Sequence, residues 1–175
     1  MKILVAYYSR TGHTRWLAER LAERLGATLC PITEPRKGSG LLWYCRAALD
    51  ALLGREAAID AAPVDPAQFD LILLGTPVWC WHLSPPVRSF ARRYRASGRR
   101  FAFFCTMGGS GAQRAFADLE RCLGRSPQAA LALTERQLDT PAAESGIQAF
   151  ISQLRAGGLP IVPPETSGVV QDGTA

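Results

Sequence analysis

Short apolar runs alternate with amphipathic helical segments along most of this chain, and this alternation limits the folds that it can adopt. Residues 2–8 form a nearly continuous apolar and aromatic run, which is typical of a strand buried on both faces of a sheet. Leucines then recur at helical spacing over residues 17–25, Gly26 ends that helix, and a second short strand is expected at residues 27–32. The two strands of such a unit lie parallel and are joined by a right-handed crossover.

The same alternation continues toward the C-terminus. We expect further strands at residues 69–74 (ended by Gly75), 100–105 and 129–133, and helices at residues 41–53, 85–94, 112–123 and from residue 141, with Thr140 as the last N-cap. Strands that alternate with helices indicate an α/β fold, a doubly wound parallel sheet of five strands with helices on both faces. We expect one domain over residues 1–156, followed by a Gly/Pro-rich tail at residues 157–175 that is loose or lies on the surface.

Composition excludes several classes of protein. With 47% hydrophobic and 20% charged residues, the 175-residue chain is typical of a soluble globular domain. No apolar run approaches the roughly 20 residues that span a bilayer, and residues 3–6 are too short for a signal-peptide core. We therefore expect a cytoplasmic protein without membrane insertion. The net charge is +5, but acidic residues are interspersed and there is no basic tail, so we expect no nucleic-acid partner.

The five cysteines are odd in number and widely spaced, with no Cys-x-x-Cys pair. This argues against a disulfide framework and against a structural zinc site, so no metal is expected. Most of the cysteines are interpreted as small buried apolar residues.

Three distinctive loops follow the first, third and fourth strands. Their sequences are SRTGHT (residues 9–14), GTPVWCWH (residues 75–82) and TMGGSG (residues 106–111). In a doubly wound sheet, ligands bind beyond the carboxyl ends of the strands at the point where the strand order reverses. The sequence therefore predicts a binding site built from these three loops at one edge of the sheet.

The first loop suits a phosphate-sized anion. Ser9, Thr11 and Thr14 supply hydroxyl groups, Gly12 permits a tight turn, and a helix starting near His13 directs its free N–H groups at the same point. Ser, Thr and Gly also commonly cap helices, so both interpretations stay open for this loop alone. No G-x-x-x-x-G-K-[ST] occurs and no G-x-G-x-x-G follows the first strand, which disfavours a nucleoside triphosphate and a Rossmann dinucleotide site.

The second and third loops suit a flat ligand. Trp79 and Trp81 flank Cys80 at the end of a strand, where they are costly to leave in water unless something flat covers them. Packing against the following helix is the alternative for either tryptophan. Residues 106–111 contain three glycines, which lets backbone approach a planar ligand closely, although a plain turn would look the same. The three loops together indicate a phosphorylated planar heterocycle, for which flavin mononucleotide (FMN) is the natural candidate.

The motif S-x-T-G-x-T resembles the phosphate loop of the flavodoxin family, and GTPVW…LSPPVRSF and FFCTMGGSG are similar to its second and third flavin-contacting loops. The resemblance covers roughly residues 1–156, and three loops in the right order are more specific than any one motif. It implies strand order 2-1-3-4-5, bound FMN and a redox function. By position, it implies cofactor contacts from Ser9, Arg10, Thr11, Gly12, His13, Thr14, Thr76, Pro77, Val78, Trp79, Cys80, Trp81, Thr106, Met107, Gly108 and Gly109. No catalytic side chain is assigned.

The basic charge departs from the family's acidic electron carriers. Arg10, His13 and Arg15 surround the first loop and His82 follows the second, and cations near a flavin stabilise its two-electron-reduced anion. We therefore expect an NAD(P)H-dependent two-electron reductase of quinones or similar acceptors. The alternatives are a non-enzymatic electron carrier that docks to partner redox proteins, and a flavin-binding sensor or a domain that has lost its flavin.

Three other patterns receive plainer interpretations. Cys30 and Arg36 match the C-x₅-R spacing of cysteine-dependent phosphatases, but the segment has two prolines and no glycine to wrap around a phosphate. Cys80 and His82 could suggest a nucleophile and its base, but side chains two residues apart need a special turn to meet, so packing around the flavin is the preferred interpretation. Six arginines between residues 88 and 100 are interpreted as a solvated helix face, or alternatively as a docking patch for an acidic redox partner or the NADP phosphate.

Overall fold

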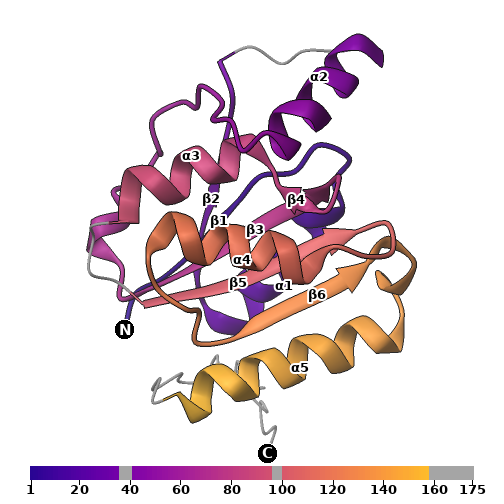
Figure 1. Ribbon diagram of the computed structural model, residues 1–175. Coiled ribbons are helices and arrows are strands. Elements are labelled where there is room, and N and C mark those ends of the chain that lie inside the picture. The colour runs from indigo at the N-terminus through magenta and orange to yellow at the C-terminus, as the bar shows by residue number, and fades with distance from the viewer. Residues whose placement is uncertain (36–40, 96–99, 158–175) are drawn as a thin grey trace, which may run out of the picture.

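The computed structural model describes residues 1–35, 41–95 and 100–157, with the side chains of residues 41–45 left out. Its central sheet has five parallel strands in the order β2-β1-β3-β5-β6 (Figure 1). Their bounds are β1 Ile3–Tyr7, β2 Thr28–Pro31, β3 Leu71–Trp79, β5 Arg100–Met107 and β6 Ala130–Thr134. The short strand β4, His82–Leu83, pairs antiparallel with the end of β3. Counting only the parallel strands, the predicted order 2-1-3-4-5 is confirmed.

Helices cover both faces of the sheet, as predicted (Figure 1). They are α1 His13–Leu25, α2 Leu41–Leu52, α3 Pro85–Tyr94, α4 Ala112–Leu123 and α5 Pro141–Ala156, with short 3₁₀ turns η1 at Pro66–Gln68 and η3 at Glu135–Gln137. One buried cluster joins α1 and α5 to the sheet, and a second joins α3 and α4 to the opposite face. The N-cap of α5 is Thr140, but its hydroxyl donates to the Gln137 carbonyl instead of capping the helix.

Strand β1 shows why a continuous apolar run predicts a buried strand. Ile3, Val5 and Tyr7 belong to the cluster under α1 and α5, whereas Leu4 and Ala6 belong to the cluster under α3 and α4. Successive side chains of a strand point to opposite faces, so a strand covered on both sides needs apolar residues at every position. Within the described residues, no helix is long and apolar enough to cross a membrane.

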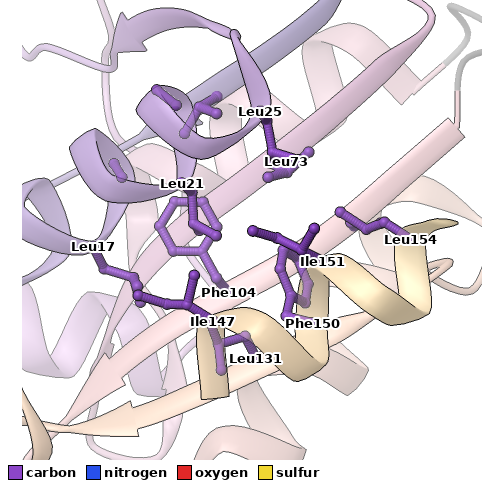
Figure 2. Close-up of a cluster of buried hydrophobic side chains, with 14 of the residues drawn as sticks. Leu17, Leu21, Leu25, Leu73, Phe104, Leu131, Ile147, Phe150, Ile151 and Leu154 are labelled. Atoms are coloured by element: carbon purple, nitrogen blue, oxygen red, sulfur yellow. The ribbon is translucent and has the colours of Figure 1, made fainter. Parts of the chain in front are cut away.

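Gly75 does not end its strand, contrary to prediction, because β3 continues to Trp79. Gly75 pairs with Phe104 on β5, and a Cβ at Gly75 would lie 2.2 Å from a carbon of the Phe104 ring. The glycine therefore makes room for a neighbouring aromatic ring within the strand. Figure 2 shows Phe104 in the core between α1 and α5, where Leu21 and Ile147 also lie.

Candidate functional site

The three predicted loops meet at the carboxyl edge of the sheet. Their strands β1, β3 and β5 are neighbours, so the loops that follow lie side by side. The Thr14 hydroxyl, in the first turn of α1, lies 2.8 Å from the Thr106 hydroxyl at the end of β5. The Trp81 indole Nε1 donates to Ser110 Oγ at 3.0 Å, which joins the second loop to the third. The structure thus brings together loops that are about 30 to 100 residues apart in the chain.

The first loop favours the anion interpretation over the helix-capping one. Helix α1 begins at His13, its N-cap is Gly12 with φ of 98°, and no side chain caps its N–H groups. Only glycine adopts such a φ readily, so the turn depends on this residue. The hydroxyls of Ser9 and Thr11 therefore do not cap α1, whose first-turn N–H groups and positive dipole end suit an anion.

Ser9 provides an independent observation at the same loop. Its Oγ is buried and has no hydrogen-bond partner within the described part of the chain. A buried polar atom without a partner costs about 1–3 kcal/mol, so such atoms are rare unless a ligand or water satisfies them. A phosphate oxygen could accept a hydrogen bond from the Ser9 hydroxyl, so the residues present here fit a phosphate group.

His13 faces a carboxylate that the sequence did not point to. Its Nδ1 lies 3.1 Å from Glu135 Oε1, in η3 after β6, and 3.2 Å from Thr11 Oγ1. Glu135 comes from a fourth strand end at the same edge of the sheet, which could have been examined but carries no distinctive motif. Because Glu135 offsets any positive charge on His13, the imidazole contributes less to an electropositive site than expected.

The second loop is a tight β-hairpin that joins β3 to β4. Val78 pairs with Leu83, leaving Cys80 and Trp81 as a two-residue turn with φ of 48° and 66°. Two-residue hairpins with two positive φ values favour Asn-Gly, and larger side chains there cost about 1–3 kcal/mol each. The sequence lacks the usual turn residues, so it did not reveal the hairpin. Such strain is common where a loop presents side chains to a ligand.

The two tryptophans lie in different surroundings. Trp79 is partly buried and meets Tyr8 edge-on, with ring centroids 5.8 Å apart. The Tyr8 hydroxyl donates to Glu34 at 2.7 Å, and burial together with Glu34 raises the pKa of Tyr8. Trp81 is 56% exposed, although Ser110 fixes its indole. The core-packing alternative therefore applies largely to Trp79, whereas Trp81 is available to a flat ligand.

Three of the predicted site threonines use their hydroxyls within the protein. Thr76 is fully buried, and its Oγ1 bonds Ser84 Oγ at 3.0 Å and the Pro77 carbonyl at 2.9 Å. Thr14 and Thr106 are also buried and bond each other. These hydroxyls hold the loops in place, and any direct role in cofactor binding stays a prediction.

A buried carboxylate that sequence reasoning missed anchors the hairpin from behind. Asp118, on α4, is 2% exposed; its Oδ2 lies 2.9 Å from His82 Nδ1 and accepts from Leu83 N at 3.4 Å and Arg88 Nη2 at 3.1 Å. Its other oxygen accepts from Arg121. Burial alone would raise the pKa of Asp118, but His82, the Leu83 N–H and Arg88 together lower it below its ordinary value. The sequence signal was an acidic residue on the apolar side of α4.

This arrangement corrects the interpretation of the arginine run for one residue. Arg88 is buried against Asp118 and does not belong to a solvated face. Arg92, Arg93 and Arg95 are exposed as expected, and Arg92 pairs with Glu56. Residues 96–99 lie outside the described part of the chain.

A pocket of about 620 Å³ opens between the second and third loops. It is lined by Trp81, Met107, Gly111, Ala112, Gln113 and Arg114. Gly111 has φ of 109°, and a Cβ there would lie 2.8 Å from the Trp81 backbone, so glycine permits the two loops to meet. Nothing lies within 4 Å of a Cβ built at Gly108 or Gly109, so both face open space beside the pocket. Such a space can admit a planar group close to the backbone.

The remaining candidates behave as buried or exposed single residues. Cys30 is buried, and burial raises its pKa to about 11, which disfavours the thiolate that a phosphatase would need. Arg36, the other half of that motif, lies outside the described residues. Cys80 is exposed on the hairpin turn, and its neighbour His82 points to Asp118 instead of toward it.

Comparison with known proteins agrees with this geometry. A protein-family model described as flavodoxin matches residues 2–151. The chain belongs to the flavodoxin family. The predicted resemblance is thereby confirmed, and a search of curated proteins finds no match.

Three of the solved structures with this fold are a flavoprotein and two flavodoxins. A flavoprotein of Lactobacillus acidophilus in complex with FMN is 22% identical, covers 79% of this chain and 96% of its own, and has a TM-score of 0.64. A WrbA-like flavodoxin from Agrobacterium tumefaciens is 17% identical over 90% and 97% of the two chains, with a TM-score of 0.61. A flavodoxin from Archaea is 18% identical over 91% and 100%, with a TM-score of 0.56. At these identities the similarity establishes the fold alone.

Proposed function

We propose that this flavodoxin-family protein binds FMN at the carboxyl edge of its sheet and acts in redox chemistry. The proposal rests on the buried Ser9 hydroxyl, which has no hydrogen-bond partner among the described residues and lies beside the uncapped start of α1, where an anion would be stabilised. The FMN complex of the L. acidophilus flavoprotein supports the choice of ligand.

The first loop would hold the phosphate and the other two loops the ring. Ser9 and Thr11 would donate hydroxyl hydrogen bonds, together with N–H groups of the first turn of α1. The open backbone at Gly108 and Gly109 and the exposed indole of Trp81 would border the flat ring system. When bound, FMN supplies hydride or electron transfer, while the protein binds and orients it.

We further propose that the protein is an NAD(P)H-dependent two-electron reductase of quinones or similar acceptors. In that reaction NAD(P)H is oxidised, and the quinone takes up two electrons and two protons to become a hydroquinone. The support is positive charge at the site: Arg15 is exposed beside the first loop, and Arg114 lines the pocket. His13 and His82 add little, because Glu135 and Asp118 face them.

The alternative is an electron carrier that passes electrons to a partner redox protein. The exposed arginines Arg93 and Arg95 on and after α3 favour it, because they could meet an acidic protein surface. NAD(P)H oxidation with 1,4-naphthoquinone separates the two functions. The FMN-loaded protein is expected to turn over, and absence of turnover would reject the reductase in favour of the carrier.

FMN binding is tested by titrating the flavin-free protein with FMN and with riboflavin, which lacks the phosphate. We expect stoichiometric FMN binding with quenched flavin fluorescence, and much weaker binding of riboflavin. Ser9→Ala should weaken FMN binding about 10- to 150-fold, which is the contribution of one hydrogen bond to a charged group, and should leave the affinity for riboflavin unchanged. Ser145→Ala, which removes an exposed serine on α5, is the control. Equal affinities for FMN and riboflavin would refute a phosphate site at Ser9.

A further inference from the structure

The pocket between Trp81 and the start of α4 has a chemistry of its own. No residue of the first loop lines it, so it lies away from the phosphate loop, toward the end of the site where the ring would lie. Trp81 lines the pocket, the hydrogen bond from its Nε1 to Ser110 fixes the edge of the indole, and the residue is 56% exposed. A fixed, exposed indole is a preorganised surface for stacking another aromatic ring.

The pocket is also lined by a cation that no described residue neutralises. Arg114 is exposed, and its guanidinium makes no hydrogen bond or ion pair with any residue that the structure describes. Arg121, two turns further along α4, is instead paired with Asp118. None of the six residues that line the pocket is acidic. A ligand with an anionic group would therefore supply the charge that Arg114 lacks.

We propose that this pocket selects planar aromatic electron acceptors that carry a carboxylate or sulfonate, with Arg114 as the residue that recognises the anionic group. The inference rests on the proposed reductase function and specifies its substrate class. Trp81, which also borders the flavin ring, presents its exposed indole to the acceptor, Met107 packs against the edge of the acceptor, and Arg114 binds the anion. Arg114 is a specificity-determining residue here and takes no part in holding FMN.

The binding test uses probes that cannot be reduced. Naphthalene-2-sulfonate and uncharged 2-naphthol are titrated into the FMN-loaded protein by calorimetry. We expect the sulfonate to bind about tenfold tighter, as one charge-assisted hydrogen bond at a partly solvated site provides. Arg114→Gln should abolish this preference, whereas Arg93→Gln, which removes an equal charge from an exposed position on α3, should retain it. Equal binding of the two probes, or a preference that survives Arg114→Gln, overturns the inference.

The kinetic test compares 1,4-naphthoquinone with its 2-sulfonate. For each acceptor, KM of the variant is divided by KM of the wild type, so the difference in reduction potential between the two quinones cancels. Arg114→Gln should raise KM for the sulfonate about tenfold relative to KM for 1,4-naphthoquinone. A rise in the KM of NAD(P)H, or weaker FMN binding by Arg114→Gln, would assign Arg114 to the donor or the cofactor and overturn the inference. Failure of the wild type to bind FMN overturns the proposed function itself, and is seen before any acceptor is added.

Discussion

Replacing Asp118 by Asn removes the charge that anchors the hairpin. The variant keeps an acceptor for the Leu83 N–H but leaves Arg88, which is 6% exposed, without its counter-ion. Removing one partner of a buried ion pair costs about 3–5 kcal/mol. Arg121 is largely exposed and adds little to this. We expect a loss near 3 kcal/mol, because the amide oxygen of the variant retains part of the hydrogen bonding.

Urea unfolding of the flavin-free protein measures this loss as a shift in midpoint at constant m-value. A domain of this size has about 5–15 kcal/mol of stability, so the variant should remain folded. Asp139→Asn is the matched control: its pair with Arg20 is 3.5 Å long and exposed, and should contribute less than about 1 kcal/mol. Combining Asp118→Asn with Arg88→Met should recover part of the loss, because no buried charge is then left unpaired. A loss below about 1 kcal/mol, or no recovery in the double variant, would refute the role assigned to Asp118.

Three further predictions follow from single positions. Gly75→Ala should lower the free energy of unfolding by at least about 1–3 kcal/mol, because the added methyl carbon would lie 2.2 Å from the Phe104 ring. Gly109→Ala is the control: no atom lies within 4 Å of its added carbon, so it should change the free energy of unfolding by less than about 0.5 kcal/mol. Cys80→Asn should raise the urea midpoint by an amount equivalent to about 0.5–1 kcal/mol, because Asn tolerates the positive φ of this exposed turn position. An unchanged midpoint would contradict the backbone strain assigned to Cys80. The pKa of Asp118 is lowered in the folded state, so the ionised carboxylate stabilises the protein above the ordinary carboxyl pKa, and this stabilisation is lost as pH falls through the folded pKa. The free energy of unfolding of Asp118→Asn should therefore change less with pH in this acidic range than that of the wild type.

The sequence predicted the parallel sheet and the meeting of three loops, because those features depend on local patterns. Burial on both faces follows from the continuous apolar run of residues 3–7, and the strand order followed from the family resemblance. The sequence did not predict the hairpin between β3 and β4, because Cys80 and Trp81 are unusual residues for a two-residue turn. Gly75 was misread as a breaker, since only the partner strand shows that its missing side chain accommodates Phe104. Contacts of this kind depend on residues that are far apart in the chain.

The charges of the site likewise depend on contacts between residues that are far apart in the chain. In the sequence, His13 and His82 were two of the four basic residues, with Arg10 and Arg15, that led us to expect an electropositive flavin site. In the structure both face carboxylates, Glu135 and Asp118, that come from other strands and helices. The cation that remains at the pocket is Arg114, which no motif had marked. Any preference of this protein for two-electron chemistry or for anionic acceptors should therefore respond to Arg114 and be nearly insensitive to His13→Gln.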